Sequence, residues 1–194
     1  TRSLVLRPKG TATVITNAER RNTGAVSWYS CQEHVPGIRL SERTPYVYDA
    51  GGRHTAGFTG DAGDCVTRAI AIAAGMDYMT VYNDLNAIAR NLPRRGASRA
   101  RATSVKTKPS SRTGHHRKVY ERYLADLGWV WTPTMQIGQG CTVHLRADEL
   151  PEGRLIVRLS RHLCAVLDGV IHDTHDPSRG GTRCVYGYWQ EPTL

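Results

Sequence analysis

The stretch "RHLCAVLDGVIHDTHD", Arg161–Asp176, decides the fold, because it reads as two strands joined by a tight turn. An Asp-Gly pair, Asp168-Gly169, separates two β-prone runs, and this pair is the strongest short-range signal for a two-residue hairpin. Placing Leu167 opposite Val170 fixes the register of every other pair in the hairpin. The sequence therefore predicts an antiparallel hairpin whose facing residues can be named in advance.

Alternation along the two strands brings several chemically active side chains to one face of this hairpin. The side chains that share the face are His162, Cys164, Val166, Ile171, Asp173 and His175. Asp173 is then a diagonal neighbour of His162, within reach of side chains of these lengths. A carboxylate beside an imidazole is the arrangement that fixes the tautomer and orientation of a general base. The hairpin therefore predicts a general base at His162.

Outward from the hairpin, the chain reads as helices followed by strands. Helical signals cover Asp64–Ala74, Tyr78–Leu92 and Arg117–Gly128. Strand signals occur in "SLVLR", "TATVIT" and "AVSWYS" near the start of the chain, at Tyr46–Tyr48, and in "WVWTPTM", "RLIVRLS" and "RCVYGYW" after Trp129. This order predicts an α+β fold in which a central buried helix packs on an antiparallel sheet.

The first helix opens with a cysteine in "GDAGDCVTRAIAIAAG", Gly60–Gly75. Asp64 is suited to be the N-cap, and Gly75 to end the helix. A thiol at a helix N-terminus has its thiolate favoured by the helix dipole, and a neighbouring imidazolium lowers its pKa further. The free N–H groups there can also stabilise an oxyanion. Cys65 with the hairpin's His162 and Asp173 thus supplies the parts of a thiol hydrolase.

The order of these residues, a cysteine at a helix start, a histidine at a strand start and an aspartate on the next strand, resembles the papain-like cysteine peptidase superfamily. "AGDCVTRAIA" looks like the nucleophile motif of the ovarian-tumour deubiquitinase branch. "GRLIVRLSRHLCAVLDGVIHDT" is more similar to bacteriocin-processing and phage-encoded papain-like proteins. The resemblance implies a cysteine peptidase or isopeptidase with Cys65 as nucleophile, His162 as base and Asp173 as orienting acid. It names no cofactor.

The chain departs from those patterns just before the cysteine. Ala62 stands where the ovarian-tumour pattern has aspartate, so that Asp61 or Asp64 replaces it or the role is empty. Thr59 stands where papain has its glutamine, which leaves the oxyanion donor to the backbone. Amidase and transglutaminase chemistry would use the same nucleophile and base, and the residues do not separate them from peptidase chemistry.

Charge suggests a second function class. The chain of 194 residues carries a net charge of +9, and much of it lies in residues 90–118, which contain almost no large apolar side chain. We predict a β-rich extension over 1–45 and a papain-like thiol hydrolase domain over 46–194, with a basic loop at 93–116. Such a segment can bind nucleic acid or an acidic protein without any catalysis. The alternative to an enzyme is therefore a binding module that uses residues 90–118.

A metal site is the third functional hypothesis for this sequence. His162, Cys164, Asp173 and His175 on one face are a plausible ligand set for zinc or iron. The case is weakened because two adjacent strands rarely complete a tetrahedral site, and no second ligand pair such as H-x-x-x-H appears elsewhere.

The cysteines and the hydropathy suggest a location and partners. An odd number of cysteines, 5, with no C-x-x-C pair favours a reduced, cytoplasmic protein. The resemblance to phage-encoded and bacteriocin-processing proteins implies a phage or bacterial origin. No apolar run approaches the length of a membrane span, so no membrane partner is expected. The expected partner is a protein or peptide substrate, and the charge favours an acidic one. The oligomeric state is not predicted.

Overall fold

The computed structural model describes residues 3–6, 12–15, 44–60, 62–92 and 109–192. The chain divides into two units, Thr1–Pro36 and Gly37–Leu194. In the first unit, the first two strand signals are observed as β1 (Ser3–Leu6) and β2 (Ala12–Ile15), and these two strands pair antiparallel. The expected strand at residues 25–30 and the stretch 93–108 of the basic loop lie outside the described residues.

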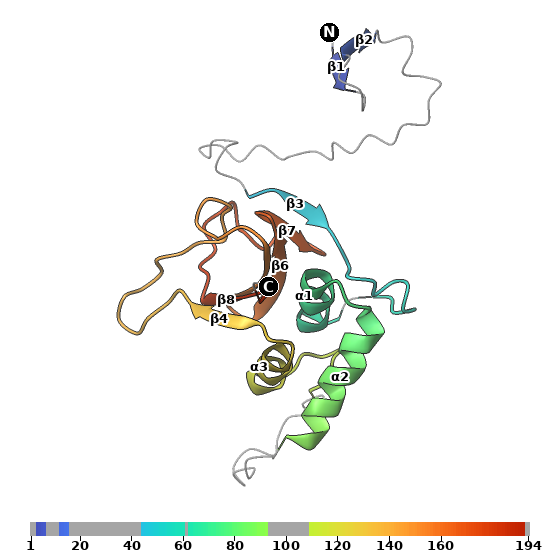
Figure 1. The fold of residues 1–194 in the computed structure, drawn as a ribbon, viewed down its shortest axis with the longest axis vertical. Helices are drawn as coiled ribbons and strands as arrows, with labels where there is room; N and C mark the ends of the chain where they lie inside the picture. The colour runs from blue at the N-terminus through green and yellow to red at the C-terminus, as the bar shows by residue number, and fades with distance from the viewer. Residues whose placement is uncertain (1–2, 7–11, 16–43, 61, 93–108, 193–194) are drawn as a thin grey trace. The chain divides into compact units, whose positions relative to one another are not determined.

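The second unit is built on a six-stranded sheet of order β3-β7-β6-β5-β8-β4 (Figure 1). The strands are β3 (Tyr46–Tyr48), β4 (Val130–Pro133), β5 (Arg154–Leu159), β6 (His162–Leu167), β7 (Val170–Asp173) and β8 (Gly187–Gln190). The α+β class is confirmed. The expectation of a purely antiparallel sheet is wrong at one edge, because β3 runs parallel to β7 while the other described pairs are antiparallel. A parallel partner so far away in sequence leaves no local signal.

The hairpin β6–β7 has the predicted register. Leu167 pairs with Val170, and Val166 with Ile171. The turn between them is Asp168-Gly169, with φ of 47° and 78°. Both values lie in the left-handed region that a type I′ turn requires, which explains why this dipeptide specifies the hairpin.

Three helices pack beside this sheet: α1 (Cys65–Ala74), α2 (Tyr78–Asn91) and α3 (Arg117–Asp126). The helix α1 lies next to β6 and β7 (Figure 1). It is buried from Val66 to Ala73, and its run of alanine and isoleucine allows close approach to the sheet. It ends at Gly75, whose φ of 63° is the left-handed conformation of a helix C-cap. The central buried helix is therefore observed where the sequence predicts it.

The sheet separates two apolar clusters. On one face, β-strand residues such as Leu163 and Ala165 pack with the three helices. On the other face, Cys164, Val166 and Ile171 pack with residues of the connections, including Leu145 and Val185. The alternation predicted for the hairpin is thus observed in its buried part, and Cys164, 1% exposed, is a core residue.

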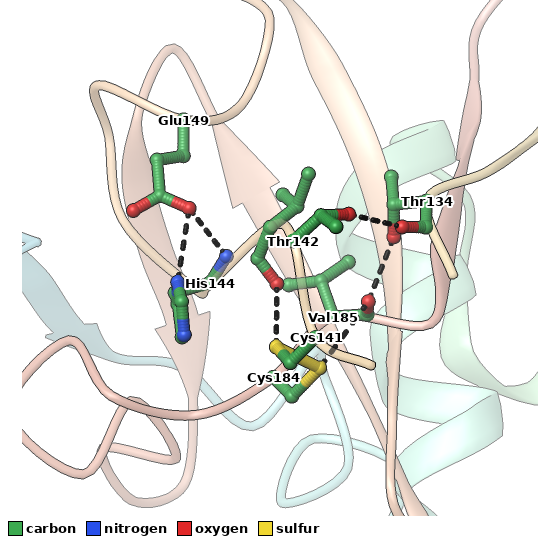
Figure 2. Close-up of a disulfide and its surroundings, with 8 residues drawn as sticks. Thr134, Cys141, Thr142, His144, Glu149, Cys184 and Val185 are labelled. Carbon is green, nitrogen blue, oxygen red and sulfur yellow. Dashed lines mark hydrogen bonds and ion pairs between the residues drawn. A yellow bond between two sulfur atoms is a disulfide. The ribbon is translucent and has the colours of Figure 1, made fainter. Parts of the chain in front are cut away.

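A disulfide joins Cys141 to Cys184, 43 residues apart (Figure 2). It holds the connection after β4 against the segment that leads into β8, where Thr134 Oγ1 also donates to the carbonyl of Val185 over 2.7 Å. The expectation that all cysteines are reduced is therefore wrong for this pair. The pairing depends on tertiary structure, since spacing along the chain gives no rule for which cysteines meet.

Candidate active site

Cys65 is the first residue of α1 and is partly exposed. Asp64 precedes it at the N-cap position, but its side chain makes no cap hydrogen bond, which corrects the role expected for it. The side chain turns instead toward α1 and α2, where it accepts hydrogen bonds from Arg68 and Tyr78. The N–H groups in the first turn of a helix have no partner within the helix, and here they donate no hydrogen bond to the Asp64 side chain.

The loop before Cys65 is held by the turn at residues 110–114. The Thr67 hydroxyl donates to the carbonyl of Ser111 over 3.1 Å. A Cβ at Gly63 would lie 3.1 Å from the carbonyl oxygen of Thr113, closer than nine in ten real Cβ contacts. Glycine at position 63 thus allows this turn to pack directly beside the approach to the thiol.

The His162 ring lies between Cys65 and Asp173. Its Nε2 is 2.5 Å from Oδ2 of Asp173, and the ring lies near enough to the Cys65 thiol for each group to shift the pKa of the other. Because Nε2 faces the carboxylate, Nδ1 is the nitrogen left for the thiol. A neutral ring in this setting keeps its proton on Nε2 and presents the Nδ1 lone pair to sulfur.

These contacts change the protonation equilibria of the pair. Burial disfavours the charged forms of both groups, yet the hydrogen bonds prevail. Those from Asp173 and Cys65 raise the pKa of His162 from 6.5 to about 9. The pKa of the Cys65 thiol is lowered from its ordinary 9.0 by His162 and by the Leu163 N–H, despite burial. The two shifts together favour a thiolate–imidazolium pair.

Asp173 is 2% exposed and is held from two sides. Burial works against its charge, but His162 and Arg68 hold its pKa below the usual value. Arg68 Nη1 donates to Oδ1 over 2.7 Å while His162 occupies Oδ2. The carboxylate therefore has one oxygen for orienting the ring and one that fixes it to α1.

Arg68 is the residue of this site that sequence reasoning missed. It is 4% exposed and bridges Asp173 to Asp64, whose Oδ1 lies 3.0 Å from its Nε. Asp64 also accepts from Tyr78 over 2.7 Å and lies 3.5 Å from Nε of Arg53. An arginine in the most apolar helix was the available signal, since a charge in a buried helix needs partners.

The remaining members of the predicted face divide between core and surface. The pKa of Cys164 is raised well above its usual value by burial, which favours the neutral thiol. His175 is exposed, and its ring centroid lies 5.1 Å from that of His162. Potential metal-ligand atoms of His162, Asp173 and His175 lie within 4.8 Å of one another. The structure thus retains three of the four proposed ligands and leaves out Cys164.

Two cavities are relevant to a site. One of about 710 Å³ is lined by residues that include Gly52, Ile72 and Tyr78, and it does not reach the Cys65–His162–Asp173 group. The other, of about 610 Å³, is lined by His162 and His175 and therefore borders that group directly. The second cavity is the one that can hold a molecule undergoing chemistry at His162.

Comparison with known proteins finds no match, either to a family model, to a curated protein or to a solved structure. None of the helices among the described residues has the length and apolar character needed to cross a bilayer. The functional argument therefore rests on the geometry of the site.

Proposed function

We propose that this protein is a thiol hydrolase that cleaves a peptide or isopeptide bond through Cys65, His162 and Asp173. The observation that carries the proposal is the position of one ring, His162, which is hydrogen-bonded to the buried Asp173 carboxylate and lies near enough to the Cys65 thiol for the two groups to shift each other's pKa. Nucleophile, base and orienting acid in contact are the recurring signature of nucleophilic acyl transfer.

In the first half of the reaction, the Cys65 thiolate attacks the carbonyl carbon of the substrate amide. A C–S bond forms, and the carbonyl electron pair moves onto oxygen. The C–N bond then breaks as the His162 imidazolium gives its proton to the leaving nitrogen. The products of this half are a thioester on Cys65, a free amine and a neutral imidazole.

In the second half, His162 takes a proton from water as the oxygen attacks the thioester carbonyl. Collapse of the tetrahedral intermediate breaks the C–S bond, releases a carboxylic acid and restores the thiolate–imidazolium pair. In both halves the oxyanion is stabilised by N–H groups of the first turn of α1, since the Asp64 side chain leaves them free of a cap.

The arrangement of elements supports the finer proposal of a papain-like fold. A buried helix begins with the nucleophile, packs on the sheet beside β6, and receives the base and the acid from adjacent strands β6 and β7. This is the order that the resemblance of the two sequence motifs implies. The bacteriocin-processing or phage-encoded branch remains part of this proposal, together with a phage or bacterial origin.

The proposal is tested by active-site labelling. The full chain is treated with a limiting amount of iodoacetamide at pH 6, and the alkylated cysteines are identified by mass spectrometry. We expect Cys65 to be modified well before Cys164, and His162→Ala to remove its advantage. Equal rates at the two cysteines would contradict the proposal, and Cys164→Ser is the matched control.

A metal centre is the second candidate, because His162, Asp173 and His175 converge. The charges around them disfavour it. Both oxygens of Asp173 are already engaged, one by Arg68 and one by His162. A cation would have to displace those partners and sit beside several arginines. Elemental analysis of the purified full chain separates the two functions, since stoichiometric zinc or iron would favour the metal centre.

A cytoplasmic, reducing location stays a prediction, and the Cys141–Cys184 disulfide weighs against it, because such bonds persist in oxidising compartments. A mass measurement on protein isolated without reductant decides whether this pair is oxidised in its source.

A further inference from the structure

The cavity beside His162 is basic. Its lining residues are Ser160, Arg161, His162, His175, Arg179 and Arg183. Three of these six are arginines, which stay charged at any pH at which the protein is folded. In the part of the chain that the structure describes, none of the three arginines pairs with a carboxylate. Arg183 is engaged by the carbonyl of Ser160, to which its Nη2 donates over 2.8 Å.

Two of these arginines occupy an unfavourable backbone conformation. Arg161 has φ of 58° and Arg179 has φ of 53°. Residues with a Cβ and no local hydrogen-bonding side chain rarely adopt this left-handed region. Glycine or asparagine would fit either turn with less strain, so packing of the backbone alone does not explain arginine there. Strain of this kind is often associated with function, and here it occurs twice at the rim of one cavity.

The position of the cavity says which part of a substrate would enter it. Its lining includes His162, which gives a proton to the leaving nitrogen, and does not include Cys65. Atoms near His162 but away from the thiol belong to the amine side of the cleaved bond. A group bound in this cavity is therefore part of the leaving fragment.

We propose that Arg161, Arg179 and Arg183 form a subsite for a carboxylate on the amine side of the scissile bond, an assignment that rests on the proposed hydrolase function. Guanidinium groups bind carboxylates through paired, charge-assisted hydrogen bonds. Arg183 donates to the carbonyl of Ser160, while Arg161 and Arg179 are exposed at the rim of the cavity, where their guanidinium groups can reach a bound carboxylate. The carboxylate comes from an acidic side chain or from the C-terminus of the leaving fragment.

Binding to the subsite is measured without catalysis. The full-length Cys65→Ala variant is titrated with three small ligands while the ring protons of His162 and His175 are followed by NMR. N-acetyl-aspartate amide carries a side-chain carboxylate, N-acetyl-alanine carries a terminal one, and N-acetyl-asparagine amide carries neither. We expect saturable shifts at His175 with one or both carboxylates and none with the asparagine ligand.

The arginines are then replaced by asparagine, which tolerates a left-handed backbone and so preserves both turns. Arg161→Asn combined with Arg179→Asn should weaken binding by at least about tenfold. Arg122→Asn, on the exposed face of α3 where it pairs with Asp126, is the control and should leave binding unchanged. Equal shifts with the aspartate and asparagine ligands would overturn the assignment, as would unchanged affinity in the double variant.

A second measurement ties the subsite to cleavage. A peptide mixture is digested with the wild-type chain, and the new N-termini are sequenced by mass spectrometry. We expect the released fragments to carry an acidic residue or a free C-terminus close to the cut, and the double variant to lose that preference. Cleavage without the preference would reject the subsite alone. An unreactive Cys65 would reject the hydrolase, while the titration would still decide whether the carboxylate binds.

Discussion

Arg68 Nη1 lies 2.7 Å from Oδ1 of Asp173, and this contact joins the helix that carries the thiol to the strand that carries the orienting acid. Arg68 follows Cys65 by one turn of α1, so that the position of Asp173 is fixed relative to the nucleophile. Because the other oxygen of Asp173 binds His162, the general base and its carboxylate are both tied to the helix that begins with Cys65.

The first prediction concerns Arg68 and stability. Arg68→Met would leave two buried carboxylates, Asp64 and Asp173, without their shared cation. Removing one member of a buried ionic group costs about 3–5 kcal/mol, and we expect a loss of that size in the free energy of unfolding by urea. Arg122→Met breaks only an exposed pair and should cost about 0–1 kcal/mol. Similar losses in the two variants would show that the buried network adds little stability.

Asp173 should control the rate rather than the binding of substrate. In Asp173→Asn the amide no longer holds the ring as a charged partner, so we expect kcat to fall by about 10²–10⁴-fold with a smaller change in KM. Asp49→Asn is a matched control, because Oδ2 of Asp49 lies 3.2 Å from Nδ1 of His172 in a comparable carboxylate–imidazole contact. His172 is the neighbour of Asp173 on β7. A similar fall in kcat in both variants would mean that Asp173 does not orient His162 for catalysis.

The third prediction is a pH dependence of stability. Folding raises the pKa of His162 from 6.5 to about 9, since its hydrogen bonds to Asp173 and Cys65 outweigh burial. A group shifted upward stabilises the fold fully below its unfolded pKa and loses that contribution as the pH rises through the folded value. The free energy of unfolding should therefore carry a contribution from His162 that declines between pH 6.5 and about 9.

Urea titrations of the wild type and His162→Gln at several pH values across this range measure that contribution. The difference between the two proteins should shrink as the pH rises. In Cys65→Ala, the ring loses one of the partners that raise its pKa, so the decline should end at a lower pH. A constant difference between wild type and His162→Gln would contradict the assignment.

The disulfide gives a prediction independent of catalysis. The Cys141–Cys184 bond closes a loop of 43 residues, and cross-links of this kind stabilise by about 2–4 kcal/mol, chiefly by restricting the unfolded chain. We expect Cys141→Ser combined with Cys184→Ser to lower the free energy of unfolding by that amount. Dithiothreitol should have the same effect on the wild type and none on the double variant. Stability that does not respond to either change would argue against the bond.

The parts of the fold that sequence alone predicted depend on local chemistry. The Asp168-Gly169 turn set the register of β6 and β7, and that register brought His162 to Asp173. Helix α1 was specified by its composition and by Gly75. In each case the determining residues are neighbours along the chain.

What the sequence did not predict depends on distant contacts. Asp64 reads as a helix cap, yet its carboxylate is taken by Arg68 and Tyr78 because a buried arginine and a buried phenol both need an acceptor. The parallel pairing of β3 with β7 and the pairing of Cys141 with Cys184 join segments far apart in the chain. Only the assembled tertiary structure determines which of these groups meet.

The division of the site between a helix and a hairpin has a consequence for biosynthesis. The hairpin pairs His162 with Asp173 on its own, but Cys65 acquires a low pKa only when α1 docks against β6. A nascent chain exposes Cys65 about a hundred residues before it has synthesised His162. Until β6 has been made and α1 has docked against it, the Cys65 thiol lacks the groups that lower its pKa, so the shift arises only late in the folding of the chain.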